Sequence, residues 1–423
     1  MSATRLPAQD APAPRALDPE RLRADFPALH RRVHGHPYTY LDSAATSQRP
    51  RSVIRAVDAY YRRTNANIHR GVYAAAEEAT ALYEGARDRI AALLDVDRSE
   101  VIYTRNATEG LNLVAYAYGE GHVGPNDAVL VTESEHHSNL LPWQRLCERR
   151  GARLEVLPVT DRGELDLSEL DAVLARGVRI VALSHVSNVL GVENPVAYVA
   201  ERAHRAGAVV VVDAAQSVPH MPVRPRALGA DFLAFSGHKM LGPTGIGVLW
   251  GRRELLEAMP PFLTGGDMVG TVHLRRATWA ELPHKFEAGT PAIAEAIGLG
   301  AAVEYLTALD LRAVAEHSRT LAMHAAERLA ELPRVTVYGP PPGAARTAVV
   351  AFNVAGVHPH DLATILDGQG VAIRAGHHCA QPLMERYGVA AMARASVYVY
   401  NRDQDLERLV AAVRRAQDVF GGA

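Results

Sequence analysis

The sequence predicts an α/β protein, in which a large domain with a mostly parallel sheet flanked by helices is joined to a smaller α+β domain. Apolar runs of strand length alternate with amphipathic helical patterns over most of the chain. The central runs are apolar on both faces, which is typical of buried parallel strands. From about Leu306 the composition changes to long Ala- and Arg-rich helical patterns with further short strands, which indicates a second domain.

Composition argues against several classes of function. Lys plus Arg (45) nearly balances Asp plus Glu (47), so the net charge of −2 gives no reason to expect nucleic acid or an anionic membrane surface as a partner. No apolar run is long enough to span a membrane. The first 20 residues are rich in Ala and Pro and lack the apolar core of a secretory signal. We therefore expect a disordered tail and a cytoplasmic protein.

The same patterns divide the chain into parts. Residues 1–20 are the expected tail, residues 38–305 the large domain, and residues 21–37 together with 306–423 the small domain. Within the first part, Tyr38 to Leu41 has the pattern of a strand and Asp42 to Thr46 that of a turn. Pro50 to Arg63 and Leu82 to Leu94 have helical periodicity.

The next segment, VIYTRNATEGLNLVAYAYG, has the pattern of a strand, a polar loop and a helix. Asn106, Ala107 and Thr108 would then occupy the turn at the start of the helix. Free backbone N–H groups and the helix dipole favour an anion at such a place, so this turn is a candidate phosphate site. Thr108 as an ordinary helix cap is the alternative, and the local sequence does not separate the two.

A further strand ends in the paired histidines His136 and His137. Such a pair suggests a metal site, but adjacent residues rarely point at one ion, and no carboxylate or thiol cluster stands at ligand spacing. We therefore predict no metal. No role is predicted for His137.

Polar residues follow the central strands where each strand ends. Leu154 to Val159 and Arg179 to Ser184 continue the alternation, and Ala208 to Val212 and Ala230 to Phe235 complete the apolar core. Because the carboxyl ends of parallel strands form the ligand crevice, the polar residues that follow them should meet in one pocket. Pyridoxal phosphate needs a lysine for its Schiff base and an acidic partner for its ring nitrogen. The residues that supply this set are Asp213, Gln216, Ser236, His238 and Lys239.

The two cysteines differ in their surroundings. Cys147 lies in a helical pattern, where a small buried apolar residue is expected. Cys379 lies in a loop after Arg374 and two histidines, between the strand pattern Val371 to Arg374 and a helical pattern near Leu383. A cationic, accessible loop favours a reactive thiolate. A chemically idle loop cysteine is the alternative.

These motifs resemble the class V aminotransferase family, and within it the cysteine desulfurases of the SufS type. D-A-A-Q followed by S-G-H-K matches the family's cofactor signature, and the matches run in order from about Leu22 to Val419. The resemblance implies the fold of type I pyridoxal phosphate transferases, with a seven-stranded sheet. The other matching motifs are Y-L-D-S-A-A, T-E-G, E-H-H, S-N-x-x-G, E-A-G-T-P, R-A-G-H-H-C-A-Q-P and R-A-S-V-Y-V-Y-N.

The resemblance also implies roles toward the cofactor. Lys239 would form the Schiff base, Asp213 would pair with the ring nitrogen, and Gln216 would bond the ring hydroxyl. His136 would stack on the ring and take part in proton transfer. The residues implied to bind the cofactor's phosphate are Ala107, Thr108, Ser236 and His238, together with Thr290, which would reach the phosphate of the partner subunit in a homodimer.

For the substrate, the resemblance implies that Arg394 and Arg374 bind the α-carboxylate and that Asn188 reaches the substrate or the ring hydroxyl. Cys379 would carry sulfur taken from L-cysteine as a persulfide, with L-alanine as the other product. An acceptor protein of the SufE or SufU type would then take the sulfur for iron–sulfur cluster assembly. A selenocysteine lyase is the alternative, and a scaffold for a sulfur carrier is a more distant one.

Overall fold

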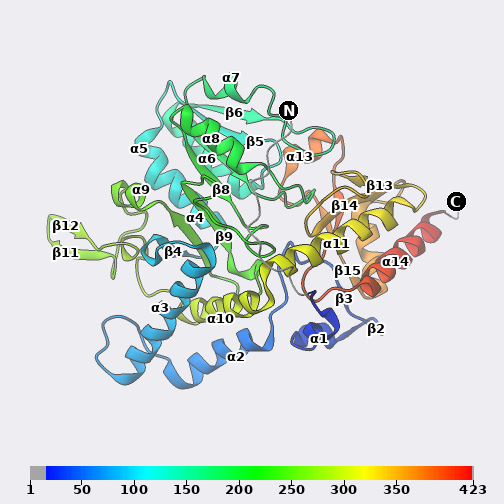
Figure 1. Cartoon of the computed structure of the whole chain (residues 1–423), viewed down its shortest axis with the longest axis horizontal. Helices are drawn as coiled ribbons and strands as arrows, with labels where there is room; N and C mark the ends of the chain where they lie inside the picture. The colour runs from blue at the N-terminus through cyan, green and yellow to red at the C-terminus, as the bar shows by residue number, and fades with distance from the viewer. Residues whose placement is uncertain (1–15, 422–423) are drawn as a thin grey trace.

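Seven strands form the central sheet of the molecule (Figure 1). The computed structural model describes residues 16–421. Six of the strands run parallel, and β10 runs antiparallel to both of its neighbours, so the predicted mostly parallel sheet is confirmed. The strands, in their order across the sheet, are β4 (Val101–Thr104), β10 (Gly247–Gly251), β9 (Phe232–Ser236), β8 (Val209–Asp213), β7 (Val178–Ser184), β5 (Ala128–Thr132) and β6 (Arg153–Leu157).

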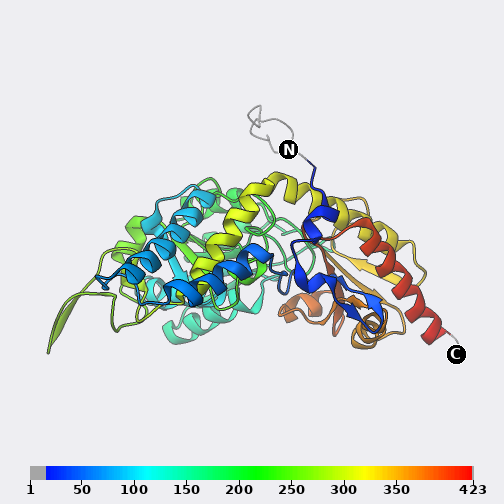
Figure 2. The same ribbon diagram turned by 90° about the horizontal axis from the view of Figure 1, so that it is seen from below.

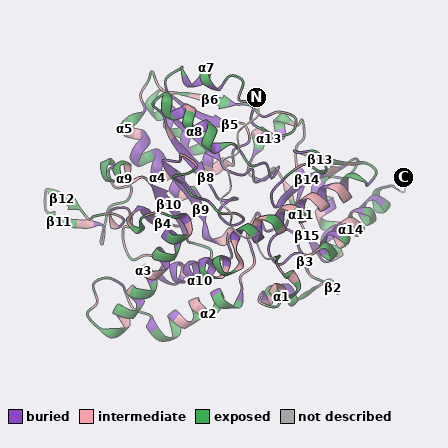
Figure 3. Ribbon diagram, in the orientation of Figure 1, coloured by how far each residue is buried: buried purple, intermediate pink, exposed green. Residues whose placement is uncertain are grey.

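Apolar side chains cover both faces of this sheet. Along β8, Val210 and Val212 belong to one core cluster and Val211 to the other, because successive side chains of a strand point to opposite faces. The run of valines therefore fits a central parallel strand buried on both sides. Figure 3 shows the buried residues concentrated in the sheet and on the helix faces against it.

Helices pack on the two faces of the sheet. On one side α10 (Ile293–Leu309) packs against α3 (Ala74–Leu94) and α2 (Arg51–Ala59). Helices α10 and α3 approach closely at Gly300, because a Cβ atom at this position would lie 2.6 Å from the Cβ of Ala86. The remaining helices of this region are α4 (Ala107–Leu113), α5 (Glu120–His122), α6 (Leu141–Arg150), α7 (Leu170–Leu174), α8 (Val196–Arg205) and α9 (Arg253–Ala258).

A second, smaller sheet has its own core. Its four antiparallel strands are covered by long helices, and a third apolar cluster fills the space between them. In Figure 2 this part lies on the opposite side of the molecule from the seven-stranded sheet, and in Figure 1 α11 leads from α10 to the smaller sheet. Its elements are β13 (Val335–Tyr338), β14 (Val349–Val354), β17 (Met392–Ser396), β16 (Arg374–Gly376), α11 (Leu311–Ala330), α12 (Pro359–Gly368), α13 (Gln381–Arg386) and α14 (Asp403–Gly421).

The amino-terminal segment lies against the smaller sheet's region. Strand β3 (Thr39–Tyr40) pairs in parallel with β15 (Val371–Ala372), although the expected large domain begins at residue 38. The segment also holds α1 (Pro19–Arg23) and a short pair of strands, β1 (Arg32–Val33) and β2 (His36–Pro37). Residues 1–15 of the expected disordered tail lie outside the described residues.

A two-stranded arm extends away from the body of the molecule (Figures 1 and 2). It consists of β11 (Val269–His273) and β12 (Arg276–Trp279), which pair only with each other. Val272 and Leu274 at its tip are exposed. An isolated hairpin of this length is marginally stable in water. Across residues 16–421, no helix combines the length and the apolar character needed to span a membrane.

Candidate active site

One cavity opens at the carboxyl ends of the parallel strands, where the sequence predicts the pocket. Its volume is about 220 Å³. Segments that follow β4, β5, β7, β8 and β9 contribute to its walls, together with β16, β17 and the loop after β3. The predicted site residues that line it are Ala107, Thr108, His136, Asn188, Asp213, Gln216, Ser236, His238, Lys239, Arg374, Cys379 and Arg394.

Lys239 and Asp213 form the charged centre of this cavity. Asp213 is the last residue of β8, and Lys239 ends the short turn that follows β9. Withdrawal from water lowers the pKa of Lys239 to about 8, while the charge of Asp213 opposes this shift. Burial raises the pKa of Asp213, against the effect of Lys239. One oxygen of Asp213 accepts a hydrogen bond from the backbone N–H of Ala215 at 2.9 Å, which leaves the other for a ligand.

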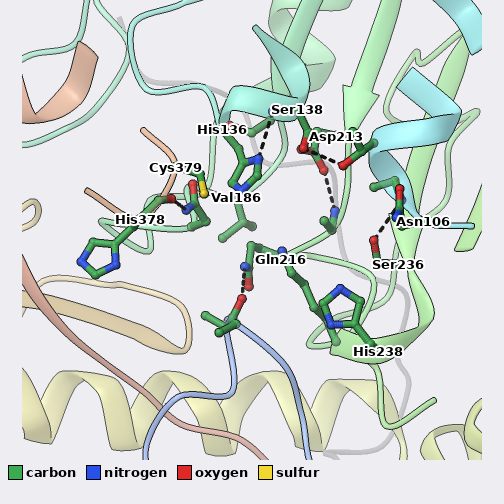
Figure 4. Close-up of a pocket in the computed structure, with 18 of the residues that line it drawn as sticks. Asn106, His136, Ser138, Val186, Asp213, Gln216, Ser236, His238, His378 and Cys379 are labelled. Carbon is green, nitrogen blue, oxygen red and sulfur yellow. Dashed lines mark hydrogen bonds between the residues drawn. The ribbon is translucent and has the colours of Figure 1, made fainter. Parts of the chain in front are cut away.

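His136 presents its ring to the same cavity, on the side of Cys379 (Figure 4). Its Nδ1 accepts a hydrogen bond from the backbone N–H of Ser138 at 3.1 Å. The proton of the neutral ring therefore lies on Nε2. Burial, with a contribution from the charge of Lys239, lowers the pKa of His136 to about 3. The ring is consequently neutral at physiological pH and is able to stack on another ring.

Hydroxyl and backbone N–H groups gather at the end of the cavity beside α4. The backbone N–H of Ala107 donates to Ser236 Oγ at 2.9 Å, and the hydroxyls of Thr108 and Ser138 are 2.7 Å apart. Asn106 caps α4 by accepting from the N–H of Glu109 at 3.0 Å. The capping alternative thus applies to Asn106, and Thr108 is free to face the cavity. Sequence reasoning missed Ser138, although it follows the histidine pair directly.

Two guanidinium groups share one carboxylate on the opposite side of the cavity. Asp42 lies 3.3 Å from Arg394 Nη2 through one oxygen and 3.3 Å from Arg374 Nη1 through the other. Arg394 also donates from Nη1 to the carbonyl of Asn188 at 2.9 Å, and its buried Nε has no hydrogen-bond partner among residues 16–421. A substrate carboxylate would satisfy that group. The sequence predicts only a turn at Asp42 and does not indicate that its carboxylate pairs with the two arginines.

Cys379 lies in the segment from the last residue of β16 to the first residue of α13, which we call the thiol loop (Gly376 to Gln381). Cys379 is half-buried and faces the cavity. The predicted strand Val371 to Arg374 is split here, because β15 pairs with β3 while β16 joins the four-stranded sheet. A second groove also reaches Cys379, and its walls include His358, His360 and His377.

Thr290 does not join this group. It is exposed and stands outside the cavity, after η7 (His284–Phe286). The sequence-based role for Thr290 requires a second subunit, so its position in one chain is compatible with that expectation.

One cluster among the described residues could hold a metal ion. It consists of His69, Glu84 and His284, and it lies outside the cavity. Glu84 is already bonded to His69 at 2.9 Å, to Arg87 at 3.1 Å and to Arg98 at 2.6 Å. The ion pairs account for this cluster, since two guanidinium groups beside the carboxylate disfavour a cation.

The cavity fits the predicted pyridoxal phosphate. An amine with a lowered pKa suits a Schiff base, and the open oxygen of Asp213 suits a protonated ring nitrogen. The hydroxyl groups beside α4 suit a phosphate. The amide of Gln216 donates to the carbonyl of Ala44 at 2.8 Å, and both residues line the cavity.

Comparison with known proteins gives consistent results. The model of the family described as "Aminotransferase class-V" matches residues 39–409. A "Probable cysteine desulfurase" of Streptomyces coelicolor is 50% identical, and the match covers 96% of this chain and 99% of that protein. The crystal structure of the Escherichia coli cysteine desulfurase CsdA, in an S-sulfonic acid form, is 41% identical with a TM-score of 0.89 and covers 96% of this chain and 100% of its own. The apo structure of a cysteine desulfurase from Thermococcus onnurineus is 40% identical with a TM-score of 0.90, and each chain is covered completely.

Proposed function

This chain belongs to the class V aminotransferase family, and we propose that it is a cysteine desulfurase that uses pyridoxal phosphate. It removes sulfur from L-cysteine, releases L-alanine and keeps the sulfur as a persulfide on Cys379. The observation that carries the proposal is that the thiol of Cys379 opens into the same cavity as Lys239. Proton transfer at an amino acid's α-carbon needs only the lysine, whereas transfer of sulfur needs a thiol as well.

In this proposal the large sheet's residues hold the cofactor. Lys239 would bind its aldehyde carbon, Asp213 would keep its ring nitrogen protonated, and His136 would stack on its ring. Gln216 would bond its hydroxyl, and the residues that would hold its phosphate are Ala107, Thr108, Ser236 and His238. When bound, the cofactor supplies an electron sink for carbanion chemistry at the substrate's α-carbon.

The substrate is held by its carboxylate. Arg394 offers an Nε–H without a partner, and Arg374 lies beside it on the neighbouring strand in register. Asn188 lies between this site and the thiol loop, since its carbonyl accepts from Arg394 and its amide donates to the carbonyl of His378 at 2.8 Å. This arrangement supports a substrate whose side chain points toward Cys379.

The bond changes then follow in order. The amine of Lys239 takes the α-proton of cysteine, and the low pKa of that amine leaves part of it unprotonated near neutral pH. The thiolate of Cys379 attacks the substrate's sulfur, so an S–S bond forms as the bond between sulfur and Cβ breaks. Cβ takes up a proton and the carbon skeleton leaves as alanine. The sulfur is oxidised and Cβ is reduced, so no external oxidant is required.

The test is to incubate the cofactor-loaded protein with L-cysteine and measure alanine, with Cys379→Ala beside the wild type. We expect alanine and a Cys379 persulfide, detected by mass spectrometry, from the wild type, and loss of both from the variant. Equal alanine from both proteins would contradict the proposal. If the variant keeps activity on selenocysteine alone, the selenocysteine lyase alternative gains support.

Finer parts of the proposal concern partners. We propose a SufS-type homodimer of the cytoplasm that passes sulfur to an acceptor of the SufE or SufU type for iron–sulfur cluster assembly. The exposed Thr290 and the apolar tip of the β11–β12 arm support the dimer. The groove beside Cys379 offers an acceptor a route to the sulfur. Analytical ultracentrifugation tests the dimer, and transfer of labelled sulfur to purified acceptors tests the partner.

A further inference from the structure

The thiol loop holds two consecutive residues in a conformation that side chains avoid. His378 has φ of 51° and Cys379 has φ of 56°, both in the left-handed region. Neither residue is glycine, so the conformation is unfavourable on its own and must be held by its surroundings. Contacts from outside the loop therefore decide where the sulfur of Cys379 lies.

His137 supplies two of these contacts. Its backbone N–H donates to the carbonyl of Cys379 at 2.7 Å. Its side-chain Nε2 accepts from the backbone N–H of Gln381 at 3.3 Å. Gln381 is the first residue of α13, and no side chain at the N-cap position bonds to that helix. The histidine ring therefore acts as a remote cap for the helix that ends the thiol loop.

The ring can do this only when it is neutral. An imidazole nitrogen that accepts from an N–H carries no proton, so the proton of His137 lies on Nδ1. Burial, followed by the charge of His377, lowers the pKa of His137. The ring of His377 lies 5.6 Å away, and its Nδ1 accepts from the N–H of Cys379 at 3.2 Å.

We propose that His137 is a positioning residue that holds the thiol loop so that the sulfur of Cys379 faces the substrate. The role rests on the proposed desulfurase function and adds to it a residue that does not line the cavity. His136 and His137 are adjacent in the chain but face different parts of the site. His136 lines the cavity, and His137 bonds the loop that carries the thiol. One peptide bond therefore connects the residue whose ring lines the cavity, His136, to the residue that positions the sulfur of Cys379, His137.

The experiment compares two substitutions of His137 in the cofactor-loaded protein. His137→Leu keeps the bulk of the ring and removes the acceptor, whereas His137→Gln can still accept from the N–H of Gln381. His324→Gln, at an exposed histidine of α11, is the matched control. Three rates are measured: the absorbance change when L-cysteine binds, persulfide formation on Cys379 in a single turnover, and alkylation of Cys379 by iodoacetamide.

We expect His137→Leu to slow persulfide formation by about tenfold to 10²-fold, the effect of misplacing a reacting group by about 1 Å. The absorbance change should keep its wild-type rate, and the alkylation rate should change because the loop is released. His137→Gln should restore most of the persulfide rate, and His324→Gln should match the wild type. If His137→Leu does not fold, His137→Asn replaces it, because its amide is too short to reach Gln381.

Two results would overturn the proposal. One is a wild-type persulfide rate and a wild-type alkylation rate in His137→Leu. The other is equal slowing of cysteine binding and persulfide formation, which would mean general damage to the site. If the wild-type protein itself makes no alanine, the proposed function fails first. The alkylation rate and hydrogen exchange of residues 376–381 would then still decide whether His137 holds the loop.

Discussion

The two halves of the site are built in different ways. The cofactor half consists of residues at the ends of strands in a seven-stranded sheet, and Asp213 is buried with apolar neighbours on both faces. The thiol half is a six-residue loop in the smaller region, half-exposed and held in an unfavourable conformation by a few hydrogen bonds. In the proposed function, rigid strands would hold the cofactor ring, and a loop that solvent can reach would carry the sulfur.

Replacing Lys239 should separate the two halves most strongly. Lys239→Ala should reduce alanine formation on the order of 10³-fold, because it removes the proposed base and the cofactor's covalent anchor. The rate of Cys379 alkylation should fall much less, because Lys239 acts on Cys379 through its charge and no hydrogen bond among the described residues joins it to the thiol loop. Lys285→Arg, at the chain's other lysine, is the control and should keep activity. A large change in alkylation would show that the halves are not independent.

The buried amine also predicts how loading depends on pH. The pKa of Lys239 is lowered from 10.5 to about 8, and only the neutral amine can bind the cofactor's aldehyde. The loading rate of the apo-protein should therefore rise about tenfold per pH unit below pH 8 and level off above it. Stopped-flow absorbance between pH 6 and 10 measures this. A rate that still rises tenfold between pH 9 and 10 would contradict it.

Replacing Asp42 tests the proposed binding of the substrate by Arg394 and Arg374. Asp42→Asn removes the charge that holds Arg394 and Arg374, so the KM for cysteine should rise about tenfold while kcat changes less. The reason is that the two guanidinium groups lose a shared anchor and repel each other. Asp58→Asn, which breaks an exposed pair with Arg62, should leave both constants unchanged. A fall in kcat with unchanged KM would assign Asp42 a different role.

The smallest effect is expected at the other cysteine. Cys147 is buried in α6, and burial raises the pKa of its thiol. Cys147→Ala should lower the free energy of unfolding by about 1 kcal/mol through lost packing, with no change in alanine formation. Urea unfolding and the alanine assay measure the two quantities. Loss of activity without loss of stability would show that the contrast between the two thiols is false.

Much of the fold could be predicted because the signals are local. The valines of β8 and the polar residues after β8 and β9 stand next to each other in the chain, and the strand periodicity needs no distant partner. The cavity then gathers every predicted site residue except Thr290, whose expected partner is another subunit.

The rest depended on distant contacts. Asp42 reads as part of a turn because its partner Arg394 lies 352 residues away. The strand pattern from Val371 to Arg374 contains two strands that belong to different sheets. This cannot be predicted locally, because it depends on the distant partners, β3 for β15 and β17 for β16. His137 received no role because its acceptor function depends on where α13 begins. Left-handed backbone at His378 and Cys379 has no signature in side chains of this kind.

The long separation of Asp42 from Arg394 in the sequence also determines when the parts of the site become available during translation. At about 5 to 20 residues per second, the ribosome needs roughly 20 to 70 s to make the 352 residues between them. For most of that time β3 has no strand to pair with, because β15 is made only shortly before Arg394, and Lys239 is made well before Cys379. The cavity is therefore complete only after its last strand, β17, has been made, and a chain that ends before Val371 lacks both Cys379 and Arg394.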